Sequence, residues 1–167
     1  MSVERQHRGD RPVFICHAGG DKETVARPLA TTLSTLGVSV WFDADELRIG
    51  DRVRPVVDSA LAGCGSAVVI FSPAFYRSRW AAEYEFDGIV SRFVADGLLL
   101  LPILHNIDRA EFRLRQPSLC SCISRSTSEF VIGDIAKEIA QVVLSRDRAP
   151  SVMRFACLGT PNGVPRR

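Results

Sequence analysis

Short apolar runs alternate with longer amphipathic stretches along this chain, and that alternation restricts the fold more than any other feature. The apolar runs lie at residues 13–16, 38–42, 67–71 and 98–104, with a weaker run at 122–126. The run at 67–71 is apolar throughout, as expected of a central parallel strand covered on both faces. Between the runs, apolar residues recur at the spacing of a helix that buries one face. Strand and helix alternate five times, which predicts an α/β sheet wound on both faces with right-handed crossovers.

Residues with strong start and stop preferences set the expected helix ends. Asp21 is expected to cap the first helix, Pro28 to kink it and Gly37 to end it. A long helix is expected to begin in the stretch from Ser72 and to continue to about Ala95. Further helices are expected at 52–61, 108–115 and 135–143.

Length, charge and cysteine content exclude several classes of protein. The 167 residues suit one domain with a sizeable core, and a net charge of +2 is too small to indicate a nucleic-acid partner. The five cysteines lack the spacing of a disulfide framework or a zinc site, so reduced thiols in the cytoplasm are the simplest interpretation. Met1 to Arg11 lacks the apolar core of a signal peptide, and the run at 98–104 is too short to span a bilayer. We therefore expect a cytoplasmic protein with no membrane partner.

The first strand ends at Cys16 and is followed by His17, Ala18 and Gly19, at the edge of the sheet where open α/β folds bind ligands. This turn can present backbone N–H groups to a phosphate, but it matches neither G-x-G-x-x-G nor a Walker loop. Its local pattern therefore favours a plain tight turn. Cys16 and His17 are adjacent, so they point to opposite faces of the sheet, and Cys16 is expected to be a small buried residue. His17 and His105 have no third ligand at a suitable spacing, so no metal is predicted.

The stretch from Ser72 to Gly88 places Trp80, Glu83 and Glu85 behind the end of the third strand. On a helix the two glutamates lie about 200° apart, so they cannot act as a paired acid and base on one small substrate. Taken alone, the pattern indicates that the two glutamates cap and solvate a helix and does not indicate a catalytic role.

Four of these segments, in this order, resemble the TIR (Toll/interleukin-1 receptor) domain in its bacterial branch. Residues 14–21 are similar to the first-strand motif F-I-S-H-A-x-x-D, and residues 40–51 to the second strand and the BB loop. Residues 72–89 are similar to S-P-x-F…W…E-L-D-G-L, and residues 101–106 to L-P-I-x-H-N. The resemblance extends from about Arg11 to Arg146.

The resemblance implies a flavodoxin-like three-layer sandwich, with five parallel strands in the order 2-1-3-4-5 and helices on both faces. The chain then divides into a polar leader at 1–10, a TIR domain at 11–146 and a flexible tail at 147–167. The implied activity is cleavage of the nicotinamide–ribose bond of NAD⁺, which gives nicotinamide and ADP-ribose or a cyclic ADP-ribose variant. NAD⁺ is the substrate, and no cofactor is implied. The alternatives are a scaffold without catalysis that acts through TIR–TIR contacts, and an enzyme like nucleoside deoxyribosyltransferases.

One glutamate suffices for this chemistry, because a carboxylate near the ribose stabilises an oxocarbenium-like transition state and cationic nicotinamide leaves without a general acid. The family spaces its residues as W-x-x-x-E, whereas Glu83 is one position short of that spacing from Trp80 and Glu85 is one beyond it. Alignment through residues 84–89 favours Glu85 as the catalytic residue over Glu83. Cys16 replaces the usual serine and is a poorer hydrogen-bond donor.

The resemblance also implies how the pocket is completed. The implied substrate-binding residues are Cys16, His17, Ala18, Gly19, Trp41, Asp43, Arg48, Ser72 and Trp80. The implied assembly residues in the BB loop are Asp45, Glu46, Leu47, Ile49 and Gly50. Neighbouring protomers, or other TIR domains, would complete the pocket through this loop. Activity would then depend on assembly triggered by an upstream sensor protein, for example in bacterial antiphage defence.

Overall fold

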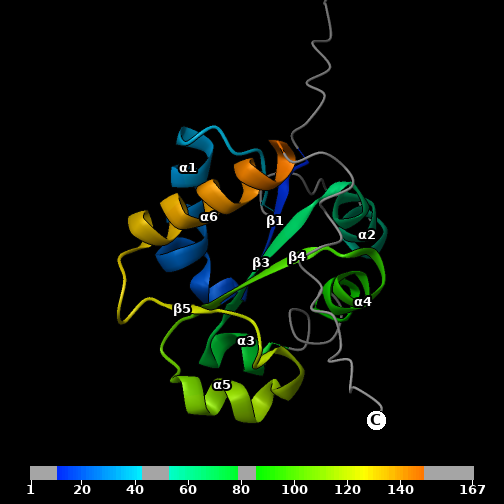
Figure 1. Ribbon diagram of the computed structural model, residues 1–167. Helices are drawn as coiled ribbons and strands as arrows, with labels where there is room; N and C mark the ends of the chain where they lie inside the picture. The colour runs from blue at the N-terminus through cyan, green and yellow to red at the C-terminus, as the bar shows by residue number, and fades with distance from the viewer. Residues whose placement is uncertain (1–10, 43–52, 79–85, 149–167) are drawn as a thin grey trace, which may run out of the picture.

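A five-stranded parallel sheet forms the centre of the computed structural model, which describes residues 11–42, 53–78 and 86–148 (Figure 1). The strands are β1 (Val13–Cys16), β2 (Val40–Trp41), β3 (Ser66–Phe71), β4 (Leu99–Leu104) and β5 (Arg125–Ser126). Their order is β2-β1-β3-β4-β5, and every paired neighbour is parallel. The predicted fold class and strand order are therefore confirmed.

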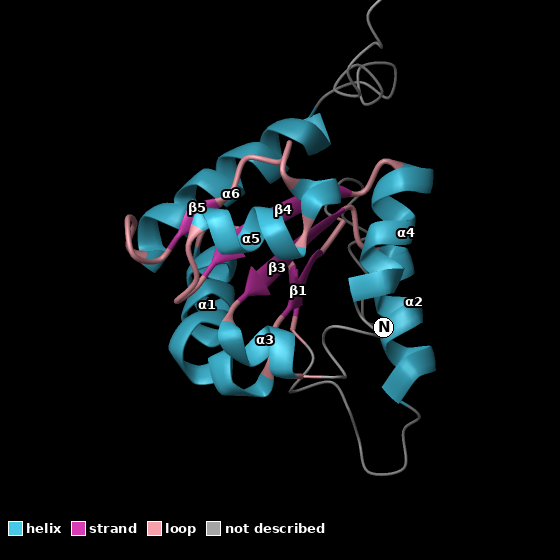
Figure 2. Ribbon diagram, turned by 90° about the horizontal axis from the view of Figure 1, so that it is seen from below, coloured by secondary structure: helices cyan, strands magenta, loops and turns pink. Residues whose placement is uncertain are grey.

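Helices cover both faces of this sheet (Figure 1). On one face lie α1 (Arg27–Thr35) and α6 (Ile132–Arg148), and on the other α2 (Val53–Gly63) and α4 (Phe86–Asp96). Figure 2 shows α3 (Pro73–Arg77) and α5 (Arg109–Arg115) near the ends of the strands that precede them. The shorter helices are η1 (Gly19–Asp21), η2 (Lys22–Ala26) and η4 (Pro117–Leu119). No helix within the described ranges is long and apolar enough to cross a membrane.

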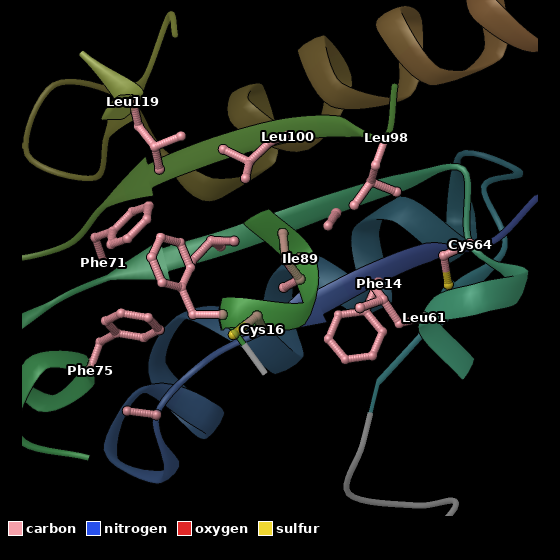
Figure 3. Close-up of a cluster of buried hydrophobic side chains, with 14 of the residues drawn as sticks. Phe14, Cys16, Leu61, Cys64, Phe71, Phe75, Ile89, Leu98, Leu100 and Leu119 are labelled. Atoms are coloured by element: carbon pink, nitrogen blue, oxygen red, sulfur yellow. The ribbon is translucent and has the colours of Figure 1, made fainter. Parts of the chain in front are cut away.

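The core is divided by the sheet into two apolar layers. Along β1, Phe14 and Cys16 contribute to the layer beneath α2 and α4, while Val13 and Ile15 contribute to the layer beneath α1 and α6. Figure 3 shows the first of these layers, with Phe71 and other buried side chains. The alternation follows from the two-residue period of a strand, and burial on both faces explains why these strands are apolar throughout.

The first helix differs from its prediction. Lys22–Ala26 forms a π-helix, and α1 begins only at Arg27, so Pro28 lies in the first turn, where its missing N–H is not needed. Ala26 and Arg27 both have helical backbone, so the π-helix continues directly into α1, and the kink at Pro28 stays a prediction. Asp21 lies at the N-cap position, as predicted, but its side chain makes no cap hydrogen bond. Gly37, with φ of 84°, follows the helix as predicted.

The helix predicted to run from the Ser72 stretch to Ala95 is not continuous. Helix α3 ends at Arg77, and Ser78 is extended with φ of −84° and ψ of 109°. The next described helix, α4, starts at Phe86, and residues 79–85 lie outside the described part of the chain. The edge strands β2 and β5 are two residues long, shorter than the runs that predicted them.

Candidate functional site

The order in which strands are added to the sheet changes direction between β1 and β3. The strand that follows β1 in the sequence, β2, lies on one side of β1, whereas β4 lies on the other side of the sheet beside β3. The carboxyl ends of strands at such a reversal are where open α/β sheets bind ligands. In this fold, residues 17–21 follow β1 and residues 72–75 follow β3. We call these two segments the switch point.

A buried carboxylate and a buried hydroxyl join the two halves of the switch point. Ser72 Oγ donates a hydrogen bond to Asp21 Oδ2 and accepts one of 2.9 Å from the N–H of Phe75. Asp21 is 5% exposed and Ser72 is fully buried. The turn also packs closely on α3, because a Cβ added at Gly20 would lie 3.4 Å from Cβ of Ala74. The exits of β1 and β3 are thus held against each other.

The His17 ring is oriented by a local hydrogen bond and by an aromatic neighbour. Its Nδ1 lies 2.9 Å from the carbonyl oxygen of Ala18. Since a carbonyl oxygen only accepts, Nδ1 carries the proton. The ring centroid is 5.1 Å from that of Phe42, the residue that follows β2. Lys22 Nζ and Arg27 Cζ lie 5.9 and 5.6 Å from the Phe42 centroid, within cation–π range.

A shallow groove of about 600 Å³ runs beside Phe42 between α1 and β2. It is lined by Arg27, Ala30, Thr31, Ser34, Thr35, Val40 and Phe42. None of these residues belongs to the switch point, so the groove is not assigned to the substrate.

Cys16 and Trp41 lie in the core, behind the switch point. The Phe14 and Trp41 rings stack with centroids 4.7 Å apart, and Trp41 is 8% exposed. Cys16 is fully buried in the same apolar layer (Figure 3), which confirms the prediction of a small buried residue. The His17 ring contacts Phe42, which packs against the apolar layer beneath α1 and α6. The side chains of Cys16 and His17 therefore point to opposite faces of the sheet, as predicted.

An aromatic cluster fixes the start of α4 at the end of β3. Phe86, the first residue of α4, packs edge-on against Phe71 and Phe75, with centroids 5.6 and 5.9 Å away. Phe71 ends β3, and Phe75 lies in α3. The chain therefore enters α4 next to the switch point.

Tyr76 extends this cluster towards α5. Its ring contacts Phe71 and Phe75, and Arg115 Cζ lies 4.5 Å from its centroid. Burial raises the pKa of the Tyr76 phenol to about 12, although Arg115 acts in the opposite direction. The hydroxyl is buried and has no hydrogen-bond partner among the residues that the structure describes.

The structure places some predicted site residues and leaves the others outside its described ranges. His17, Ala18, Gly19 and Ser72 meet at the switch point, whereas Cys16 and Trp41 lie in the core. The predicted residues outside the described ranges are Asp43, Asp45, Glu46, Leu47, Arg48, Ile49, Gly50, Trp80, Glu83 and Glu85. The functional roles of both groups stay predictions.

Sequence reasoning missed the bond between Asp21 and Ser72. The two residues are 51 positions apart, so no local pattern connects them. The available signal was the order of the strands, because a sheet with β1 beside β3 brings the residues that follow both strands together.

Comparison with known sequences is consistent with this geometry. Residues 13–128 match the TIR domain family. The chain is 39% identical over 134 residues to the 2' cyclic ADP-D-ribose synthase AbTIR of Acinetobacter baumannii, which covers 80% of this chain and 49% of that protein. It is 36% identical over 134 residues to the NAD(+) hydrolase TcpC of Escherichia coli, which covers 80% of this chain and 43% of that one. The chain thus spans about half the length of these curated relatives.

Solved structures show the same fold at lower identity. The TIR domains of the activated Roq1 resistosome give a TM-score of 0.60 at 18% identity, over 81% of this chain and 98% of that one. A metazoan TIR-STING receptor from C. gigas gives 0.64 at 19% identity, over 84% of this chain and 42% of that one. Together with the match over residues 13–128, these findings establish that the chain belongs to the TIR domain family.

Proposed function

We propose that this TIR domain cleaves the nicotinamide–ribose bond of NAD⁺ and releases nicotinamide with ADP-ribose or a cyclic ADP-ribose variant. The relatives described above are named for these reactions. The structural observation that carries the proposal is the packing of Phe86 on Phe71 and Phe75. Phe86 directly follows Glu85 in the sequence, so this packing supports our proposal that the catalytic residue acts near the carboxyl end of β3.

In the proposed reaction, the bond from ribose C1′ to the nicotinamide nitrogen breaks, and its electron pair neutralises the pyridinium ring. The Glu85 carboxylate holds the ribose hydroxyls and stabilises the positive charge that develops at C1′. Water then attacks C1′ in hydrolysis, or a hydroxyl of the same ADP-ribose attacks in cyclisation, and either nucleophile releases one proton to solvent.

Described residues at the end of β1 also support the proposal. The turn after β1 places His17, with its tautomer fixed by Ala18, beside the exposed Gly19. We propose that this turn contacts the substrate and that Cys16 and Trp41 support it from the core.

The test is nicotinamide release by concentrated wild-type protein and by three variants, namely Glu83→Ala, Glu85→Ala and the double variant. We expect Glu85→Ala to lose activity by about 10²- to 10³-fold, as is typical when a group that stabilises transition-state charge is removed. We expect Glu83→Ala to retain activity. Full activity in the double variant would overturn the assignment.

We further propose that the active form assembles from several copies in the cytoplasm, through BB-loop residues that include Leu47 and Ile49. An upstream sensor protein would trigger assembly, with antiphage defence as the biological setting. Purification of the protein from infected and uninfected cells, with measurement of its oligomeric state, its bound proteins and its NAD⁺ turnover, tests this part of the proposal. A protein that stays monomeric and inactive in both would contradict it.

A scaffold without catalysis is the second candidate. Two features of this chain favour it, namely the shifted spacing from Trp80 to Glu85 and the cysteine at position 16. Specific binding to another TIR domain, together with no NAD⁺ turnover by concentrated or support-bound protein, would establish this alternative.

A further inference from the structure

We propose that Asp21 is a positioning residue that acts through Ser72 to hold the two halves of the switch point in the arrangement that binds NAD⁺. The inference rests on the proposed function, because it concerns the same site. It assigns Asp21 a role that the capping prediction did not.

The first argument is that the Ser72 hydroxyl is oriented from both sides. A serine hydroxyl has one hydrogen to donate and two lone pairs to accept with. Its hydrogen is given to Asp21 Oδ2, and one lone pair accepts from the N–H of Phe75. Asp21 therefore sets the direction of the group that begins α3.

The second argument is that, within the described part of the chain, the partner of the buried Asp21 carboxylate is a neutral hydroxyl. Asp21 is 5% exposed, and no ion pair recorded among the described residues includes it. The neighbouring Lys22 directs its ammonium group over the Phe42 ring. Burying a carboxylate with a neutral partner is unfavourable, and natural proteins tolerate such arrangements mainly at functional sites.

The third argument is the location of the pair. It spans the carboxyl ends of β1 and β3, where the strand order reverses. Helix α3 lies between β3 and the segment that leads to α4, so a shift of α3 changes where that segment starts. Displacement of reacting groups by about 1 Å can lower a rate by about 10²-fold.

The chain offers a matched control in Asp108. Its carboxylate accepts a 2.7 Å hydrogen bond from the N–H of Glu111 at the start of α5, just as Ser72 caps α3. Asp108 is exposed and does not belong to the switch point. Asp108→Ala therefore removes a helix cap without touching the proposed site.

The experiment measures the KM for NAD⁺ and the amide hydrogen exchange of residues 74–78 in wild type, Asp21→Ala, Asp21→Asn and Asp108→Ala. We expect Asp21→Ala to raise KM by about tenfold or more and to speed exchange in α3. Partial unfolding lowers the active fraction but leaves KM unchanged, so KM separates positioning from stability. Asp21→Asn should recover most of the loss, because its amide oxygen still accepts from Ser72. Asp108→Ala should lower Tm by a few degrees with KM unchanged.

The outcomes separate this inference from the proposed function. A wild-type protein that releases no nicotinamide contradicts the proposed function, and exchange in α3 then decides whether Asp21 holds this helix. Exchange and KM in Asp21→Ala equal to those in Asp108→Ala would overturn the inference. So would Asp21→Asn being as impaired as Asp21→Ala, or a raised KM with unchanged exchange, since Asp21 would then act on the substrate directly.

Discussion

At the residue scale, burial sets the chemistry of several polar side chains. Desolvation disfavours the charged form of a phenol or a thiol, so it raises the pKa of Tyr76, Cys64 and Cys122. The side chain of Cys120, by contrast, is exposed. Composition does not show these differences, because they depend on which side of each element faces the core.

Replacing Tyr76 with phenylalanine tests whether the phenol hydroxyl contributes to stability. The hydroxyl is buried without a described partner, so its removal relieves a desolvation penalty of about 1 kcal/mol and keeps the ring contacts with Phe71 and Phe75. We expect Tyr76→Phe to be as stable as wild type or slightly more stable in urea unfolding. A loss of more than about 1 kcal/mol would show that the hydroxyl is hydrogen-bonded after all.

Thiol reactivity provides a second test at this scale. Burial raises the pKa of Cys64 to about 11, so almost none of this thiol is ionised at pH 8. Among these three described cysteines, we expect iodoacetamide at pH 8 to modify exposed Cys120 first, Cys122 more slowly and Cys64 only after unfolding. Peptide mass spectrometry over a time course checks this order. Rapid labelling of Cys64 in the folded protein would contradict the burial described here.

At the scale of elements, the sequence patterns predicted the strands and most helices, because apolar periodicity directly reflects burial. They failed where distant contacts decide. The sequence could not show that α3 ends at Arg77. The Ser78 N–H donates the last hydrogen bonds of this helix to the carbonyl oxygens of Ala74 and Phe75, and the side chains of these two residues pack in the core at the end of β3. For the same reason, the link from Asp21 to Ser72 could not be predicted.

The end of α1 offers a test of backbone conformation. Gly37 has φ of 84°, and an added Cβ would meet no atom within 4 Å. Gly37→Ala should therefore lower the free energy of unfolding by about 1 kcal/mol through strain alone. Gly133 near the start of α6 is the control, because its Cβ also has free space and its φ is not positive. Gly133→Ala should leave stability unchanged or raise it by up to about 1 kcal/mol. Equal effects of the two substitutions on the free energy of unfolding in urea would contradict the positive φ of Gly37.

At the scale of the whole molecule, the resemblance supplied what periodicity could not, namely the strand order and the expected chemistry. The structure confirms the order and brings the ends of β1 and β3 together. The catalytic and BB-loop residues named by the resemblance lie outside the described ranges, so their roles rest on proposals.

The proposed assembly predicts how activity depends on protein concentration. If neighbouring copies complete the site, nicotinamide release per molecule should rise steeply with protein concentration. Replacing exposed Leu114 on α5 with serine is a control that leaves the BB loop intact, whereas Ile49→Asp should abolish the rise. Analytical ultracentrifugation at the same concentrations checks the association. Specific activity independent of concentration would contradict the proposal.

The most direct test of the central claim is the initial rate of nicotinamide release from NAD⁺ by wild type and by Glu85→Gln, with Glu83→Gln measured beside them. Glutamine keeps the size of the side chain and removes only its charge. The account predicts that Glu85→Gln falls by about 10²-fold or more while Glu83→Gln stays close to wild type. Equal rates for Glu85→Gln and wild type would contradict it.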